Sequence, residues 1–291
     1  TKAAFSDADG IIFVGACGIA VRACAPYVQD KFHDPAVVVI DDCAKFCISL
    51  LSGHVGGANC LALEAAEICG AMPVVTTATD VNGRFAVDVW AKENGLQIVE
   101  RAAAKKISSV LLEGGSVGAC TRFGQEISLP FPLPDGLEDR ESGETGFCVT
   151  LDETDSPFRE TLHLVPRRVI LGIGCRKDTP PEMLETAVLK ALEKEKISLR
   201  AVQAVCSVDL KAREKALLMF CEKYSLPFTT YSSERLAELE GDFSASEFVK
   251  KITGVENVCE RAAMAGGGER LLFRKKKYPS VTVAASWSRK K

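Results

Sequence analysis

A histidine set among glycines is the first feature of this chain that suggests chemistry. His54 is one of three histidines and lies beside Gly53, Gly56 and Gly57 in the stretch LLSGHVGGAN. Its imidazole can exchange protons near neutral pH, and glycines let a ligand approach the backbone closely. The amides of Gly56 and Gly57 are candidate donors to an oxyanion. The loop is predicted to be a proton-transfer site, with a purely structural histidine as the alternative.

A polar segment follows the next apolar stretch of the chain. Its residues are Thr76, Thr77, Thr79 and Asp80. The end of a strand is where open α/β sheets bind ligands, so this segment is a candidate substrate contact. Asp80 is predicted either to orient His54 or to act as a base itself, and Arg84 is predicted to help orient the substrate. A plain polar loop is the alternative.

A second candidate site follows an apolar run in the C-terminal half. Gly172 and Gly174 resemble the start of a dinucleotide-binding fingerprint, but Lys177 stands where its third glycine belongs, which disfavours that function. Arg176 and Lys177 lie beside an expected helix start, which favours an anion-contacting loop that includes Gly174. A tight strand-to-helix turn is the simpler alternative.

Two other basic segments are interpreted mainly in structural terms. Ser207 and its neighbours are predicted to cap the next helix, leaving Lys211 available to an acidic ligand. The lysines of Lys275–Lys277 are predicted to form a solvated turn.

All-apolar strands that alternate with helices must position these residues. Strands are expected at 11–14, 36–40, 46–51, 73–76, 169–173, 201–208, 228–231, 271–273 and 281–284. Helices are expected at 19–28, 58–69, 87–92, 102–112, 183–194 (with Thr179 as N-cap), 211–224, 233–239, 246–252 and 255–265. This alternation is typical of sheets covered on both faces. It predicts two α/β domains with mainly parallel sheets, at 1–81 and 165–291, joined by a less regular middle region at 82–164 with a linker near 163–168.

Composition excludes some classes of protein. The chain has 291 residues, 47% of them hydrophobic, and a net charge of −3. A nucleic-acid-binding protein is usually basic, no apolar run approaches the ~20 residues of a membrane span, and no signal peptide is recognisable. A cytoplasmic protein with neither a nucleic-acid nor a membrane partner is expected.

The twelve cysteines contain no C-x-x-C pair, so the usual zinc and thioredoxin signatures are absent. They are interpreted as reduced thiols, with Cys24 and Cys69 expected on apolar helix faces. No metal site is predicted; a cysteine-ligated metal or cluster is the alternative.

Taken together, these segments resemble a family of cobalamin biosynthesis enzymes, the cobalt-precorrin-5A hydrolases of the anaerobic corrin pathway. The matching stretches are residues 10–31, 34–42, 48–59, 73–80, 170–180, 207–212, 246–264 and 265–272. The family usually carries a strand and a helix before the first of these stretches. Because they are essentially absent here, the first domain is expected to be incomplete or to be completed by a partner chain.

The resemblance implies a reaction and a ligand. The family opens a δ-lactone of a cobalt-corrinoid with water and releases acetaldehyde, giving cobalt-precorrin-5B. The substrate carries the cobalt, so no further cofactor is expected. Its carboxylates are expected to meet Arg22, Arg84, Arg176, Lys177 and Lys211. Other corrin-pathway enzymes are possible partners, and the oligomeric state is left open. The alternative is a non-catalytic protein that binds and transfers corrinoid intermediates.

Overall fold

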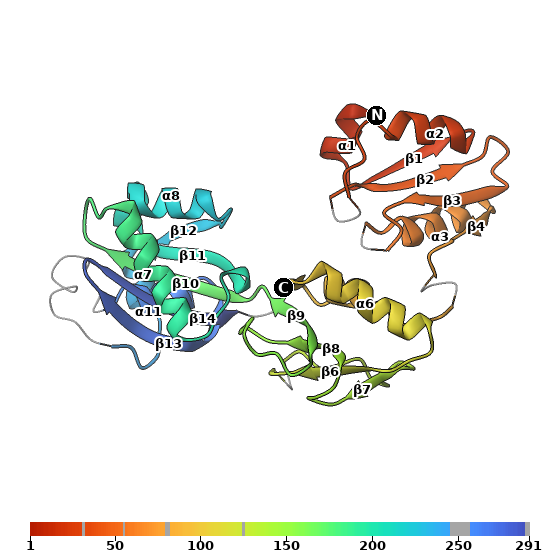
Figure 1. Cartoon of the computed structure of the whole chain (residues 1–291). Helices are drawn as coiled ribbons and strands as arrows, with labels where there is room; N and C mark the ends of the chain where they lie inside the picture. Colours follow the sequence, from red (N-terminus) through yellow and green to blue (C-terminus); the bar gives the residue numbers. More distant parts are fainter. Residues whose placement is uncertain (31–32, 55, 79–81, 124–125, 245–256, 289–291) are drawn as a thin grey trace. The chain divides into compact units, whose positions relative to one another are not determined.

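The structure, a computed structural model, describes residues 1–30, 33–54, 56–78, 82–123, 126–244 and 257–288 (Figure 1). It divides into two compact units. The first unit comprises Thr1–Asn94, Glu100–Cys148 and Pro157–Leu162, and the second comprises Gly95–Val99, Val149–Ser156 and His163–Lys291. Among the described helices, none combines the length and the apolar character needed to cross a bilayer.

The N-terminal part of the chain forms a four-stranded sheet in the order β1-β2-β3-β4. Its elements are α1 (Lys2–Asp7), β1 (Gly10–Val14), α2 (Cys17–Cys24), β2 (Ala36–Ile40), β3 (Phe46–Leu51), α3 (Ala58–Cys69) and β4 (Met72–Val74). The β1/β2 and β3/β4 pairs are parallel, whereas β2/β3 is antiparallel. Every residue of β2 is buried, and α3 packs its alanines against β2 and β3. The all-apolar sequence of β2 follows from this burial.

The middle part is more regular than the sequence predicted. It contains α5 (Val87–Glu93), β5 (Leu96–Ile98), α6 (Arg101–Leu112), β6 (Val117–Thr121), β7 (Leu137–Asp139), β8 (Thr145–Val149) and β9 (Glu160–Pro166). The strands form one sheet in the order β5-β9-β8-β6-β7. The predicted linker near 163–168 is wrong for residues 163–166, because His163 through Pro166 are buried residues of β9.

The C-terminal part forms a five-stranded sheet in the order β12-β11-β10-β14-β13. Its elements are β10 (Val169–Cys175), α7 (Pro181–Lys194), η1 (Leu199–Ala201), β11 (Val202–Val208), η2 (Asp209–Lys211), α8 (Lys215–Lys223), β12 (Phe228–Tyr231), α9 (Ser233–Ala237), α11 (Cys259–Ala265), β13 (Gly268–Tyr278) and β14 (Val281–Ser288). Strands β10, β11 and β12 are parallel, and β14 pairs antiparallel with both β10 and β13. The α/β class with largely parallel sheets is confirmed.

Successive residues of β10 face opposite layers of this sheet. Leu171 packs with Leu184 of α7 and Leu217 of α8, whereas Ile170 packs with Ala262 of α11. Side chains of a strand alternate between faces, so the all-apolar sequence of β10 reflects helices on both sides (Figure 1).

Two predicted helix caps are wrong. Pro180, not Thr179, is the N-cap of α7, and the Thr179 hydroxyl donates to the Arg176 carbonyl at 2.8 Å. Ser207 is fully buried inside β11, where its hydroxyl donates to the Ile173 carbonyl at 2.7 Å. Both hydroxyls satisfy carbonyls in or beside β10, a contact that local sequence does not reveal.

Other helix and strand boundaries also differ from those predicted. The helix predicted at 211–224 begins only at Lys215, and Cys259 opens the described part of the helix predicted at 255–265. Lys275–Lys277 is not a turn but lies within β13, which pairs with β14. The helix predicted at 246–252 lies outside the described residues.

Candidate functional site

The loop that carries His54 is a tight turn leading into α3. Gly57 is the N-cap of α3 with a φ of 92°, a left-handed conformation that favours glycine. A Cβ on Gly56 would lie 2.1 Å from the Cβ of Ser52, so only glycine fits there. The Gly57 amide donates to the carbonyl of His54 at 3.0 Å. The Gly57 amide is therefore engaged within the turn, and Gly56 is the remaining oxyanion-donor candidate of the two.

His54 lies beside an acidic residue that sequence reasoning missed. Its Nδ1 is 3.6 Å from Oδ1 of Asp88, and the two side chains are only 9% and 11% exposed. Asp88 is in the first turn of α5, and its Oδ1 also accepts the amide of Val89 at 3.1 Å. Asp80, the predicted partner, lies outside the described residues. A carboxylate next to Nδ1 orients an imidazole ring and favours the tautomer with its proton on Nδ1, which leaves Nε2 to act as a base.

The threonine segment has a structural role at one position. Asn59 of α3 is 7% exposed; its Nδ2 donates to Oγ1 of Thr77 at 3.0 Å, and its Oδ1 accepts from Ser49 at 2.7 Å. A Cβ on Gly53 would lie 2.7 Å from that Oδ1. Gly53 and Thr77 thus pack around Asn59 and tie the His54 loop to the end of β4.

The other predicted residues of the first unit lie apart from these contacts. Thr76 is exposed just after β4, and Thr79 lies outside the described residues. Arg22 is exposed on α2, where its guanidinium donates to the carbonyl of Gly18 at 3.2 Å. Arg84 is half-buried, four residues before Asp88.

The four predicted residues of the second unit lie together in a pocket of about 900 Å³. Gly174, Arg176, Lys177 and Lys211 all line it. It opens where β10 and β11 reach their carboxyl ends, which is where ligands bind in open α/β sheets. We call this cavity the basic pocket.

The basic pocket carries a strong excess of positive charge. Seven Lys and Arg residues line it against two acidic ones, Asp178 and Glu214. The cations that sequence reasoning missed are Arg213, Lys215, Lys275 and Lys277. Lys211 is not available as predicted, because its Nζ lies 2.9 Å from Oε2 of Glu214. The remaining cations leave the lining with an excess of positive charge, which favours anions.

The wall of the basic pocket is apolar and contains two thiols. Val208, Val258 and Val281 line it together with Cys175 and Cys259. Burial raises the pKa of the Cys175 thiol to about 11, although the charge of Lys211 opposes this rise. Burial likewise raises the pKa of Cys259 to about 12. Both thiols are neutral near pH 7, so the wall behaves as an apolar surface.

The glycines of β10 are explained by close packing rather than by a nucleotide loop. A Cβ on Gly172 would lie 1.8 Å from the carbonyl oxygen of Cys259, where α11 crosses the strand. A Cβ on Gly174 would lie 2.7 Å from Oγ1 of Thr282 in β14. Gly172 and Gly174 therefore form neither the predicted tight turn nor a dinucleotide-binding fingerprint, because both lie within strand β10.

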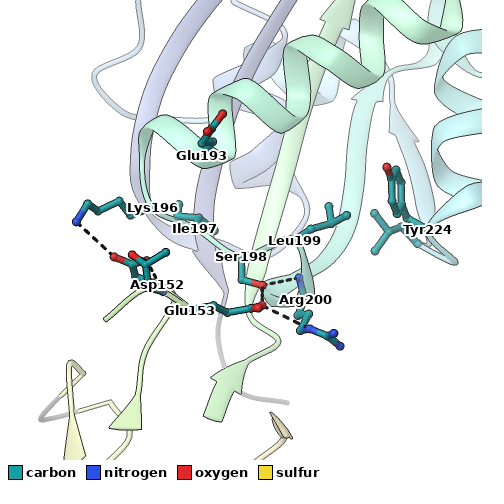
Figure 2. Close-up of a pocket in the computed structure, with 11 residues that line it drawn as sticks. Asp152, Glu153, Glu193, Lys196, Ile197, Ser198, Leu199, Arg200 and Tyr224 are labelled. Carbon is teal, nitrogen blue, oxygen red and sulfur yellow. Dashed lines mark hydrogen bonds and ion pairs between the residues drawn. The ribbon is translucent and has the colours of Figure 1, made fainter. Parts of the chain in front are cut away.

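A second hollow of the same unit, about 750 Å³, is lined by charges that pair with one another. Lys196 Nζ lies 3.5 Å from Oδ2 of Asp152. Figure 2 shows Glu153 between Ser198, which donates a hydrogen bond to it, and Arg200, whose Nε lies 3.4 Å away. These pairs join the segment before β9 to the α7–β11 connection. Their mutual pairing makes this hollow a weaker ligand site than the basic pocket.

The twelve cysteines are present as thiols. Cys24 is buried, as expected, but Cys69 is exposed. Within the described residues, the one cluster with metal-ligand spacing is Asp41, Asp42 and Cys43. Asp41 there accepts the backbone amides of Cys43 and Phe46 at 2.9 and 2.5 Å, which is the geometry of a β2–β3 turn.

Three family models match successive parts of the chain. They describe the cobalamin synthesis G N-terminal region (residues 1–80), the cobalamin biosynthesis central region (85–166) and the cobalamin synthesis G C-terminus (169–286). Together the three models account for nearly the whole chain.

Curated relatives match over almost the same length. The chain is 40% identical to a cobalt-precorrin-5A hydrolase of Salmonella typhimurium, covering 97% of this chain and 83% of that protein. A protein of the same name from Priestia megaterium is 32% identical, with 97% and 79% covered. A solved structure of CobE, a protein from the cobalamin (vitamin B12) biosynthetic pathway, is 27% identical over 42% of this chain and 91% of that chain, with a TM-score of 0.39.

Proposed function

The chain belongs to the family of the cobalt-precorrin-5A hydrolases, and we propose that it hydrolyses cobalt-precorrin-5A. The observation that carries this proposal is 40% identity to a named hydrolase across 97% of the chain. The acid–base pair of His54 and Asp88 supports it, because lactone hydrolysis needs a base for water.

The proposed reaction opens the lactone first. Water adds to the lactone carbonyl, the acyl C–O bond breaks, and the ring-A acetate is released as a carboxylate beside a new hydroxyl on the two-carbon fragment. That hydroxyl then loses its proton and becomes the carbonyl of acetaldehyde. The carbon–carbon bond to the macrocycle breaks, its electron pair enters the conjugated macrocycle, and a proton is added there. The step is therefore also a carbon–carbon bond cleavage, and the substrate itself supplies the electron sink.

Two elements of the first unit have proposed roles. His54 takes the proton from water at Nε2, and the Asp88 carboxylate, whose Oδ1 lies 3.6 Å from Nδ1 of His54, stabilises the imidazolium that forms. The Gly56 amide, at the turn before α3, donates to the oxyanion of the tetrahedral intermediate. Gly57 is excluded from that role by its bond to the His54 carbonyl.

The test is single-turnover incubation of the full chain with purified cobalt-precorrin-5A under anaerobic conditions in H₂¹⁸O. We expect one acetaldehyde per substrate, trapped as a hydrazone, and one ¹⁸O in the new carboxylate by mass spectrometry. If a folded preparation binds the substrate and the substrate is recovered unchanged, hydrolysis is ruled out and a binding or transfer protein is the better description. Label absent from the carboxylate would rule out attack at the acyl carbon.

A further inference from the structure

Strand β13 brings two lysines into the basic pocket from far along the chain. Strand β14 pairs antiparallel with both β10 and β13, so β13 runs in the same direction as β10. The C-terminal end of β13 therefore lies at the same end of the sheet as the C-terminal end of β10, at Cys175. Lys275 and Lys277 line the pocket there, together with Arg176 and Lys177.

The lysine between them is directed elsewhere. Lys276 Nζ lies 2.5 Å from Oε1 of Glu195, at the end of α7, and Lys276 does not line the pocket. Neighbouring residues of a strand face opposite sides, so the run of three lysines is divided between a structural ion pair and the cavity. The chain as a whole has a net charge of −3, which makes the local concentration of cations a specific feature of this cavity.

Lys275 is held in place through its backbone. Its amide donates to Oε1 of Glu260 at 2.8 Å, and Glu260 is fully buried. The same carboxylate accepts the amide and the hydroxyl of Ser244 at 2.9 and 2.7 Å. Glu260 binds the backbone amide of Lys275, so this contact does not involve the ammonium group of the side chain. The charge of that ammonium group acts to lower the pKa of the Cys259 thiol on the pocket wall, against the effect of burial.

We propose that the basic pocket binds the rim carboxylates of the corrinoid macrocycle and that Lys275 and Lys277 are specificity-determining cations that distinguish carboxylate from amide side chains. The identity of the macrocycle rests on the proposed function. A cavity of about 900 Å³ is within the ~300–1,000 Å³ range of small-molecule sites. Its apolar wall suits the face of a macrocycle, and its cations suit the rim.

The test compares two corrinoids that share a macrocycle. Dicyanocobyrinic acid carries carboxylates at its rim, and dicyanocobinamide carries amides there. Binding of each to the full chain is measured by calorimetry, for the wild type, the K275Q/K277Q double variant and the K276Q control. The control removes the same charge from the same strand outside the pocket. We expect wild type to bind the acid at least tenfold more tightly than the amide.

The double variant is expected to lose roughly tenfold in affinity for the acid, as for two partly exposed charge pairs. Its affinity for the amide and the K276Q affinities should stay within about twofold. The K275R/K277R variant, which keeps the charges, should restore acid binding, and this separates lost charge from misfolding. Equal affinities of wild type for the two corrinoids, or an unchanged double variant, would overturn the proposal.

The two proposals can fail separately. In one outcome, the chain binds the acid in a way that depends on Lys275 and Lys277 and yet releases no acetaldehyde. That result would support the proposed role of the basic pocket and reject the proposed hydrolysis. Acetaldehyde release by a K275Q/K277Q variant with wild-type KM and wild-type acid affinity would uphold the hydrolase and reject this role for the lysines.

Discussion

The α-carbon of Gly172 in β10 faces the carbonyl oxygen of Cys259, so closely that a Cβ at Gly172 would lie only 1.8 Å from that oxygen. This approach seats α11 against the sheet and sets Cys259 and its neighbour Val258 on the wall of the basic pocket. The atoms nearest to such a Cβ belong to the backbone of Cys259 and Ala263, so no flexible side chain could move to make room for it.

Replacing Gly172 with alanine is therefore expected to destabilise the second unit by about 3 kcal/mol or more, since overpacking here displaces backbone. Urea unfolding followed by fluorescence measures the change. Gly18→Ala is the control, because a Cβ there meets only the end of the Arg22 side chain at 3.4 Å; it should be neutral or slightly stabilising. A G172A variant as stable as G18A would show that α11 is not packed this closely.

From the pairing of His54 with Asp88 we predict how substitutions at these residues change the rate of acetaldehyde release. His54→Gln should lower the rate of acetaldehyde release by about 10²–10⁴-fold, as expected for the loss of a general base. Asp88→Asn should lower it less, because the base remains and only the carboxylate that orients it is lost. His33→Gln is the control, since His33 is exposed and paired with Asp30 at 2.8 Å. A wild-type rate in H54Q would remove His54 as the base.

The thiols of the chain should differ in reactivity with pH. Cys43, Cys60 and Cys69 are exposed, whereas burial raises the pKa of Cys175 to about 11. Because the thiolate is the nucleophile, alkylation of Cys175 should rise about tenfold per pH unit between pH 7 and 10. Peptide mass spectrometry after timed iodoacetamide treatment measures it.

A second variant tests the cause of that behaviour. The charge of Lys211 lowers the pKa of Cys175, so Lys211→Gln should raise it further and slow alkylation at a given pH. Lys276→Gln should have no effect. Alkylation of Cys175 at the same rate as Cys43 would contradict the burial of this thiol.

The buried carboxylate of Glu260 predicts a pH dependence of stability. Burial alone would raise the pKa of Glu260, but hydrogen bonds from Ser244 and from the Lys275 amide outweigh it and hold the pKa below its ordinary value. A depressed carboxylate pKa stabilises the fold above the unfolded pKa of about 4.3, and this stability is lost as pH falls through the folded value.

Glu260→Gln should thus cost about 1.5–3 kcal/mol at pH 7, and the difference from wild type should shrink as the pH drops below about 4. Urea unfolding of both proteins at pH 7 and at a pH below about 4 measures this difference in stability. Glu222→Gln, on the exposed side of α8, should stay within about 0.5 kcal/mol of wild type. A cost for E260Q that is the same at both pH values would contradict an ionised Glu260.

The sequence was sufficient for elements whose signals are local. The bounds of β2 and α3 agree with those predicted, because an all-apolar run specifies β2, and an apolar stripe that ends at a C-cap glycine, here Gly70, specifies α3 without reference to distant residues. The basic segment at Arg176 and Lys177 was also recognisable, since it directly follows such a run, and its contact with an anion stays a prediction.

Only the tertiary structure decided which distant residues join these segments. Lys275 and Lys277 reach Arg176 through two antiparallel pairings, Asp88 reaches His54 through the fold of the first unit, and Gly172 is required by a helix that begins at Cys259. Strand register and helix packing set these contacts, and the energy of both comes from pairing with segments remote in sequence. The local pattern therefore indicated an anion site, whereas the sheet determined its full set of charges.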